Sequence, residues 1–472
     1  MCLAAILACL SVLANHATEH PVSNAQEIAA AAKIAKPGDE IVMAEGEWTD
    51  QKIVFEAQGE EARPIALRAK TPGKTIVTGV STLTLAGRHL VVSDLLFKDG
   101  SHGPVPAKPP LAHERAVVSF KLDDERCATH TRLTRCEIRD WKSEAKYHVP
   151  WIYIAGHSEK NRVDHCRFSG QNHRGETIVV IPEEKPNRHR IDHNFFGKRE
   201  RGGLREDVKA NGHETIRIGG KDHNTFESYT LVEYNHFEEC DGEDEMISNK
   251  SFCNIYRNNL FRNCIGELVL RGGERCVVEN NRFENCRGGI RVNGTHHRIV
   301  GNVIIDARGA GIRLIAGWET HAVVTDCLIA NNTIVNAQAQ GILFADWLKG
   351  EVLRDGTVRD KGGTELPVRN KVVNNLIVGS KGVLIELKGS TDNVLSHNLL
   401  HATGEAQVGE AGSNAILADP KFANAAEHDY RLAEDSPARG AGMPLDEVSK
   451  AFPVGAEAAP FSAGPAAPGA GK

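Results

Sequence analysis

The sequence predicts an all-β fold, a parallel β-helix in which short strands stack coil upon coil. The first reason is a repeat, because similar hexapeptides begin at Asn235, Asn259, Asn281 and Asn302, with spacings of 24, 22 and 21 residues. Between them lie short β-branched pieces and polar turns, with few helix signals. Leucine-rich repeats have a similar period, but their Leu-x-x-Leu-x-Leu frame is absent. The repeat therefore indicates a solenoid whose coils bury their apolar faces against one another.

The asparagine column extends over most of the chain. Further members, some of them degenerate, are Cys136, Cys166, Asn194, Asn332, Asn375 and Asn398. In a stacked solenoid each side-chain amide can bond the equivalent amide one coil away and satisfy buried backbone at the turn. We therefore predict an asparagine ladder with Asn259, Asn281 and Asn302 stacked at one turn. Spacings stretched to 30, 41 and 43 residues, after Cys136, Asn194 and Asn332, indicate inserted loops.

The cysteines follow the same period. Cys240, Cys264 and Cys286 each end one of the hexapeptides, and none of the 11 cysteines forms a Cys-x-x-Cys pair. Free cysteine packs as a small buried hydrophobe. We expect these three in one interior column, with Cys253 and Cys276 in another, as structural thiols rather than as disulfides or metal ligands.

The two ends of the chain differ from the repeat. The apolar run from Leu3 to Ala14 is too short to span a bilayer and predicts a signal peptide over residues 1–17, hence a secreted or periplasmic protein, although no Lys or Arg precedes it. Ser23 and Gln26 predict a capping box before a short helix that ends at Ala35 and covers the first coil. Residues 451–472, rich in Pro, Gly and Ala, are expected to be a disordered tail, which leaves 18–450 as the β-helix domain.

Composition narrows the possible partners. The 472 residues are 41% hydrophobic and 25% charged, which is ordinary for a globular protein. The formal net charge is −6, whereas general binding to nucleic acid needs clustered positive charge. We expect no nucleic-acid partner and no membrane-spanning helix, and we make no prediction about the oligomeric state.

Basic residues recur at the coil period. Lys250, Arg271, Arg291 and Arg313 follow one another at 21, 20 and 22 residues, and Arg217 precedes Lys250 by 33, which fits a coil plus an insertion. Alternation with apolar neighbours is typical of a half-buried strand, so we expect these side chains in one outward-facing row. A row of like charges is self-repulsive. It therefore indicates either a site for a polyanion lying along the stack or a solvated face with counter-ions.

An acidic segment lies beside this row. Glu243 and Glu245 point to one side if the segment is extended, five residues before Lys250. Two such close carboxylates repel each other unless a hard cation lies between them, and oxygen ligands favour Ca²⁺. Asn211, about one expanded coil earlier, could add a carbonyl oxygen. The alternative is a solvated acidic turn without a metal.

These segments resemble polysaccharide lyase family 6, which contains alginate lyases and chondroitinase B. The similar segments are Asn211-Gly-His-Glu-Thr-Ile-Arg-Ile-Gly219, Glu243-x-Glu245-x4-Lys250 and Leu270-Arg271. The resemblance implies a right-handed parallel β-helix of the pectate-lyase type. It also implies that Lys250 is the Brønsted base, Arg271 the Brønsted acid, and Asn211, Glu243 and Glu245 the calcium ligands. Gly272 departs from the family, which commonly has His after the catalytic Arg.

The chemistry expected of such residues is β-elimination in a 4-linked uronan. The base removes the proton at C5 while the oxygen at C4 is expelled, and a bound Ca²⁺ would neutralise the adjacent C6 carboxylate. Arg271 is effectively always protonated, so it is expected mainly to stabilise charge at the leaving oxygen. The proton donor to that oxygen stays open.

Several alternatives remain at the level of sequence. A charge on every sugar, as in alginate, matches a basic residue in every coil better than dermatan sulfate does, and dermatan sulfate is the second choice. A β-helix glycoside hydrolase would use the carboxylates of the acidic segment but leaves Lys250 and Arg271 unexplained. A C5-epimerase and a non-catalytic polyanion-binding solenoid are the remaining candidates.

Overall fold

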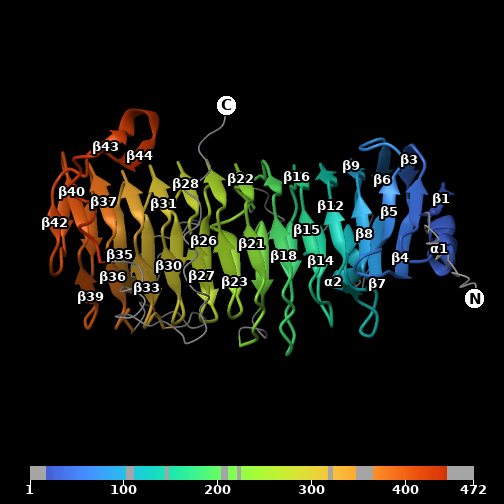
Figure 1. The fold of residues 1–472 in the computed structure, drawn as a ribbon, viewed down its shortest axis with the longest axis horizontal. Coiled ribbons are helices and arrows are strands. Elements are labelled where there is room, and N and C mark those ends of the chain that lie inside the picture. The colour runs from blue at the N-terminus through green and yellow to red at the C-terminus, as the bar shows by residue number, and fades with distance from the viewer. Residues whose placement is uncertain are drawn as a thin grey trace, which may run out of the picture.

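The computed structural model describes residues 17–102, 111–143, 148–202, 211–220, 225–316, 323–346 and 365–443. They form an elongated stack of coils, with the N-terminal end at one tip and the last coils at the other (Figure 1). The signal peptide predicted over residues 1–17 lies outside the described residues except for Ala17, and so do the end of the predicted domain at residue 450 and the predicted tail. No helix in the described part of the chain is long and apolar enough to cross a membrane.

Three long parallel sheets, which we call A, B and C, run the length of the described stack. Sheet A consists, in order, of β1 (Glu19–Val22), β2 (Glu40–Met43), β5 (Ile65–Ala69), β8 (Leu90–Ser93), β12 (Arg132–Thr134), β15 (Arg162–Asp164), β18 (Arg190–Asp192), β21 (Leu231–Glu233), β24 (Ile255–Arg257), β27 (Val277–Glu279), β30 (Arg298–Val300), β33 (Leu328–Ala330), β36 (Lys371–Val373) and β39 (Val394–Ser396). Sheet B consists of β3 (Gly46–Thr49), β6 (Thr75–Thr78), β9 (Leu96–Lys98), β13 (Glu137–Arg139), β16 (Arg167–Ser169), β19 (Phe195–Phe196), β22 (His236–Glu238), β25 (Leu260–Arg262), β28 (Arg282–Glu284), β31 (Val303–Ile305), β34 (Thr333–Val335), β37 (Leu376–Gly379), β40 (Leu399–Ala402) and β42 (Ile416–Leu417). Sheet C consists of β11 (Ala128–Thr129), β7 (Thr82–Arg88), β10 (Val118–Ser119), β14 (Ile152–Ile154), β17 (Ile178–Val180), β20 (Ile216–Gly219), β23 (Glu245–Lys250), β26 (Glu267–Gly272), β29 (Ile290–Val292), β32 (Ile312–Ala316), β35 (Gln340–Asp346), β38 (Val383–Glu386) and β41 (Gln407–Gly409), with β4 (Lys52–Gln58) beside β7.

Among the described residues, few regular elements other than turns lie outside these sheets. The helices are α1 (Ala25–Ile34), α2 (Ala112–Arg115) and a 3₁₀ turn (Ala425–Glu427), and β43 (Phe422–Asn424) pairs with β44 (Asp429–Leu432) in a hairpin near the last coils (Figure 1). Each strand pairs in parallel with its equivalent in the next coil. The parallel β-helix with a short N-terminal helix predicted from the sequence is therefore confirmed.

The asparagine ladder predicted from the repeat is also confirmed. Oδ1 of Asn281 accepts hydrogen bonds from the backbone N and Nδ2 of Asn259 at 3.0 and 2.9 Å, and Oδ1 of Asn302 accepts the same two bonds from Asn281 at 3.0 Å. Further rungs are Asn194, Asn235, Asn332, Asn375 and Asn398. The residues before two of the rungs, Asn258 and Asn280, have φ of 54°, a left-handed conformation that asparagine adopts more readily than most residues. The hydrogen bonds between the side-chain amides keep these sharp turns in register from coil to coil.

Sulfur and aromatic side chains stack inside the coils. Cys240, Cys264 and Cys286 follow one another in a buried column, and all nine described cysteines are free and buried, as predicted. The prediction that Cys253 and Cys276 form a second interior column is wrong by one residue. The register of β24 and β27 aligns Cys276 with Asn254 rather than with Cys253, because Cys253 occupies the preceding turn with φ of 63°.

Helix α1 covers the N-terminal end of the stack with three buried side chains, Ile28, Ala31 and Ala32. Its cap lies one residue later than the sequence pattern predicts. Asn24, not Ser23, is the N-cap, and its side chain accepts a hydrogen bond from the backbone N of Glu27 at 2.9 Å. Asn24 is at least as good a cap as serine, and Glu27, rather than Gln26, supplies the returning carboxylate.

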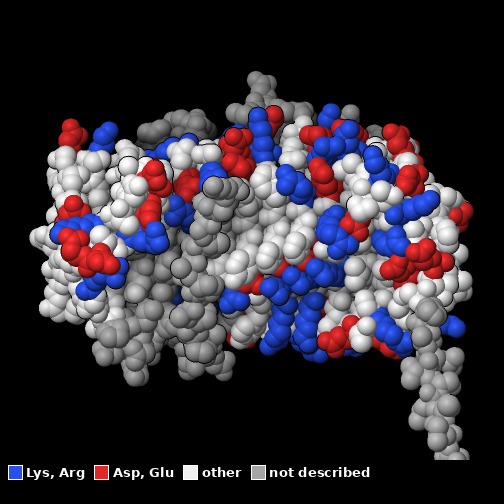
Figure 2. All heavy atoms as spheres, turned by 45° about the horizontal axis from the view of Figure 1, so that its top comes forward, with Lys and Arg blue, Asp and Glu red and all other residues white. Residues whose placement is uncertain are grey.

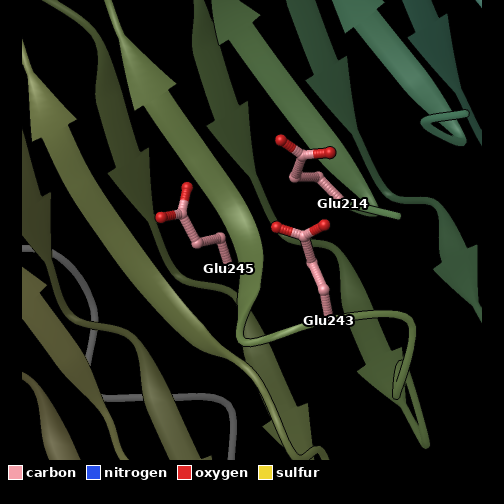
Figure 3. Close-up of side chains that lie close together, drawn as sticks. All are labelled: Glu214, Glu243 and Glu245. Carbon is pink, nitrogen blue, oxygen red and sulfur yellow. The ribbon is translucent and has the colours of Figure 1, made fainter. Parts of the chain in front are cut away.

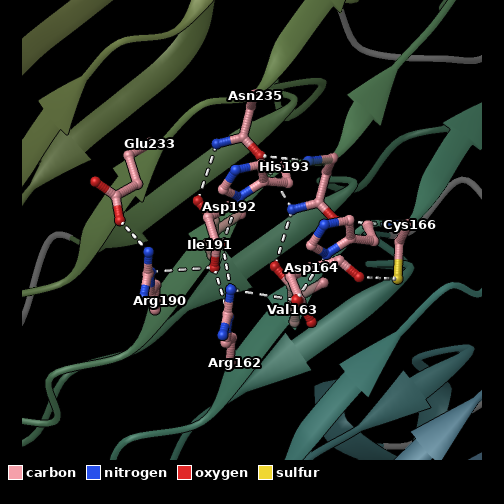
Figure 4. Close-up of polar contacts among 12 residues, drawn as sticks. Arg162, Val163, Asp164, Cys166, Arg190, Ile191, Asp192, His193, Glu233 and Asn235 are labelled. Carbon is pink, nitrogen blue, oxygen red and sulfur yellow. Dashed lines mark hydrogen bonds and ion pairs between the residues drawn. The ribbon is translucent and has the colours of Figure 1, made fainter. Parts of the chain in front are cut away.

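Sheet A carries a charge ladder, in which a column of arginines lies beside a column of carboxylates across successive coils (Figure 4). Arg162 bonds Asp192 at 2.6 Å, and Arg190 bonds Glu233 at 2.6 Å. Arg162 also lies 3.3 Å from Asp164. The carboxylates of this sheet A ladder are buried, and each is bonded by arginines. Figure 2 shows one face of the molecule, on which groups of Lys and Arg side chains lie next to groups of Asp and Glu side chains.

Candidate active site

The five basic residues predicted from the coil period lie on one face of sheet C, but in two columns. Backbone pairing carries one column from Arg217, through β23 and β26, to Arg291 and Arg313. Lys250 and Arg271 lie two residues further along their strands than this column, and alternate residues of a strand point to the same side. The single row expected from the spacing is therefore split, with Lys250 and Arg271 next to each other on adjacent coils.

A β-bulge separates these two residues. Asn249 pairs with Leu270, but the next pair is Lys250 with Gly272, so Arg271 is the extra residue on β26. A bulge re-aims the side chain that it carries. The short spacing of 20 residues between Arg271 and Arg291 arises because Arg271 lies two residues beyond Val269, the residue that pairs with Arg291.

A second row, made of glutamates, accompanies the basic residues. The register of the strands, extended to their N-terminal ends, aligns Glu176, Glu214, Glu245 and Glu267 in successive coils. Sequence reasoning missed three of these, although the tripeptide Glu-Thr-Ile recurs at 176–178 and 214–216 and could have revealed the alignment.

Each basic side chain bonds one of these glutamates. Lys250 Nζ lies 3.3 Å from Glu214 Oε1, and Arg271 Nη1 lies 3.5 Å from Glu245 Oε2. The remaining pairs are Arg217 with Glu176, Arg291 with Glu245 and Arg313 with Glu267. The basic row is thus balanced by the protein itself, which explains how like charges are tolerated in adjacent coils.

The basic side chains differ in exposure. Lys250 is 17% exposed, and Arg217, Arg271 and Arg313 are similarly half-buried. Arg291 is only 5% exposed and bonds Glu245 at 2.5 Å. The structure therefore places Arg291 beneath the surface that the other four reach.

Three carboxylates converge next to Lys250 (Figure 3). Glu214, Glu243 and Glu245 are all buried, and each offers an oxygen that lies within 4.8 Å of the others. Glu243 is held by the chain ahead of β20, because its Oε2 accepts hydrogen bonds from the backbone N of Gly212 and His213 at 2.7 and 2.8 Å. Glu214 Oε2 is buried and has no hydrogen-bond partner among the described residues.

The electrostatics of this cluster are unbalanced. Burial, and then repulsion from Glu214, raise the pKa of Glu243 to about 8. Burial acts to raise the pKa of Glu245 as well, but the guanidinium groups of Arg291 and Arg271 outweigh it and hold that pKa well below its usual range. Glu243 forms no ion pair with any residue that the structure describes. Three converging buried carboxylates, one of them without an ion pair among the described residues, fit a hard divalent cation.

The structure changes the set of candidate ligands. Glu243 and Glu245 converge as predicted, and Glu214 joins them, which sequence reasoning had not selected. Asn211 is exposed in the turn before Gly212, and its backbone oxygen accepts a bond from Arg174 at 2.9 Å. Its role as a ligand stays a prediction.

The family model described as Chondroitinase B matches residues 22–429. The PL6 family alginate lyase AlyGC is 31% identical, with a TM-score of 0.73, over 93% of this chain and 58% of that one. A mannuronic acid specific family 6 lyase from human gut microbiota is 27% identical, with a TM-score of 0.66, over 82% of this chain and 87% of that one. This chain thus spans less than two thirds of the length of AlyGC. No curated protein matches it.

Proposed function

Because this chain belongs to the chondroitinase B family, we propose that it is a polysaccharide lyase that cleaves a 4-linked uronan by β-elimination. The observation that carries the proposal is the juxtaposition on sheet C. Lys250 and Arg271 lie on adjacent coils, and each bonds a different member of the glutamate cluster, Glu214 or Glu245. A base, a fixed cation and a site for a divalent metal are what elimination beside a carboxylate requires.

We assign the proton abstraction at C5 to Lys250. Its amine has to be neutral to accept the proton, and the bond to Glu214 fixes the direction of its side chain. Arg271, held by Glu245, stabilises the negative charge that develops on the leaving oxygen at C4. The guanidinium is a poor proton donor, so the proton for that oxygen comes from another group.

We assign the metal site to Glu214, Glu243 and Glu245, with Asn211 as the fourth ligand, and the metal to Ca²⁺. When bound, Ca²⁺ would supply the positive charge that neutralises the uronate carboxylate. Three or four protein ligands leave open positions among the 6 to 8 that Ca²⁺ prefers. Arg291 holds Glu245 in place from beneath, so we assign it to the support of the cluster.

Arg217 and Arg313 flank this centre and are the candidates for binding the sugars on either side. Both donate to glutamates, Glu176 and Glu267, and both keep part of their side chain exposed. Coils advance about 4.8 Å each, similar to one sugar ring of an extended chain. A polymer with a carboxylate on every sugar suits such a face, which favours alginate over dermatan sulfate. The similarity to AlyGC and to the mannuronic acid specific lyase supports the same choice.

A secreted or periplasmic location follows for a protein that acts on such a polymer, in line with the signal peptide predicted over residues 1–17. The domain would extend over 18–450. A glycoside hydrolase on this fold would not need Lys250 and Arg271 side by side on adjacent coils. A C5-epimerase would return a proton to C5 without breaking the chain.

The product distinguishes these functions. Only a lyase forms an unsaturated uronate, which absorbs in the ultraviolet. We expect absorbance to rise with alginate, or with its mannuronate or guluronate blocks, faster than with dermatan sulfate or pectate. Faster product formation from dermatan sulfate would reverse the choice of substrate and keep the mechanism. New reducing ends without ultraviolet absorbance would indicate a hydrolase.

A further inference from the structure

Asn249 is a polar residue in an otherwise apolar interior column of sheet C. It precedes Lys250 on β23, and the adjacent coils place Ile218 and Leu270 at the same position. Its side chain is fully buried. A buried amide is tolerated when its polar atoms are hydrogen-bonded. The partners of Asn249 therefore indicate what the residue does.

All four hydrogen-bonding positions of the Asn249 amide are used. Nδ2 donates to the backbone oxygens of Gly272 and Ser251 at 2.8 and 3.0 Å. Oδ1 accepts from the Tyr256 hydroxyl at 2.9 Å and from Asn254 Nδ2 at 2.8 Å. Tyr256 and Asn254 are themselves fully buried. The amide thus makes all its hydrogen bonds and links the end of β23 to the end of β26.

The bond to Gly272 lies at the bulge. Lys250 pairs with Gly272 because Arg271 is the extra residue, and Asn249 binds the carbonyl of the residue directly after Arg271. In an unshifted register Arg271 would stand opposite Lys250, with two cations on neighbouring strands about 4.8 Å apart. The bulge avoids this arrangement and turns Arg271 toward Glu245.

We propose that Asn249 is a positioning residue that sets the placement of Arg271 relative to Lys250 by holding this bulge. The inference rests on the proposed roles of Lys250 and Arg271. Asn249 touches neither the substrate face nor the glutamate cluster, since it points into the core. The Tyr256 hydroxyl donates a hydrogen bond to Oδ1 of Asn249 and so fixes the rotamer that keeps Nδ2 directed at Gly272.

The test compares three variants of the full chain, assayed on the polymer that gives the ultraviolet-absorbing product. Asn249→Leu restores the apolar column and should lower kcat at least tenfold, with KM within threefold of the wild-type value. Tyr256→Phe removes one hydroxyl and should lower kcat two- to fivefold. Val278→Ala, at the position equivalent to Tyr256 in the next coil, opens a cavity without a polar link. It should lower the unfolding temperature and keep kcat within twofold.

Two results would overturn the inference. One is a folded Asn249→Leu enzyme with kcat within twofold of wild type, or, if that variant does not fold, a Tyr256→Phe enzyme with unchanged kcat. The other is a loss of kcat in Val278→Ala as large as in Asn249→Leu, because stability alone would then explain both. Lys250→Ala, assayed in parallel, distinguishes a failure of this inference from a failure of the catalytic role proposed for Lys250. An active Lys250→Ala enzyme ends the assignment of Lys250 as the base, on which this inference rests, whereas an inactive one beside a fully active Asn249→Leu enzyme ends only this inference.

Discussion

Sheets A and C both carry rows of charge, but they balance them differently. In the sheet A ladder the buried carboxylate of Asp164 lies between Arg132 and Arg162, at 2.5 and 3.3 Å, so its charge is matched within the stack. On sheet C, Glu214 and Glu243 converge with Glu245 within 4.8 Å, and Glu243 has no ion pair with a described residue. The same coil spacing thus yields a structural ladder where each buried carboxylate has arginine partners. It yields a candidate site where like charges meet, because such a cluster needs a further cation.

The largest contrast should appear in activity. Lys250→Ala should lower kcat by about a thousandfold, equivalent to about 4 kcal/mol of barrier, because the base is lost. Arg162→Ala on the sheet A ladder should leave kcat within twofold and lower the free energy of unfolding. Initial rates from ultraviolet absorbance, with unfolding followed by circular dichroism, measure both. Retention of more than a tenth of the wild-type kcat by Lys250→Ala would remove this residue from the role of base.

Removal of the metal should affect only sheet C. With excess chelator, activity should fall at least tenfold, and added Ca²⁺ should restore it, because the carboxylate of the substrate is then neutralised again. The unfolding temperature should rise with Ca²⁺, as expected for a ligand that binds only the folded chain. Full activity in excess chelator would mean that the basic residues neutralise the substrate without a metal.

Replacing a buried carboxylate by a neutral amide should change the free energy of unfolding in opposite directions on the two sheets. In chelator, Glu243→Gln should raise the free energy of unfolding by about 1 kcal/mol, because it removes repulsion from Glu214 while its amide oxygen still accepts the two backbone bonds. Asp164→Asn should lower it by about 2 kcal/mol, because Arg132 and Arg162 lose a buried partner. Denaturant titration measures both. Destabilisation of the metal-free protein by Glu243→Gln would show that the cluster is already balanced.

The smallest expected effect is on acid stability. Burial acts to raise the pKa of Asp164, but its bonds to Arg132 and His165 outweigh it and lower that pKa below its usual value. A depressed pKa in the folded state contributes stability above the pKa of the unfolded chain, about 3.9, which is lost as the pH falls through the folded value. The difference in unfolding free energy between wild type and Asp164→Asn should therefore shrink as the pH falls below 4. A constant difference down to pH 3 would contradict the ion pairs of the ladder.

Sequence reasoning succeeded where one residue type must recur in every coil. The asparagines at 259, 281 and 302 are visible because the ladder needs an amide at each turn, and the cysteine column follows from the same period. Lys250, Arg271, Glu243 and Glu245 could be selected because they lie in coils of nearly constant length. The family resemblance, which the match over residues 22–429 confirms, rests on the same segments.

The sequence by itself thus determined the coil, its ladder and the residues near the site, since these depend on period and residue type. Only the tertiary structure decided how the residues meet. Glu214 joins the cluster because strand pairing aligns it with Glu245 across an interval of 31 residues, which an inserted loop hides in the sequence. Arg271 is turned aside because a bulge shifts the register, and Arg291 is buried against Glu245. Register is set by contacts between strands, and these contacts exist only once the coils have stacked.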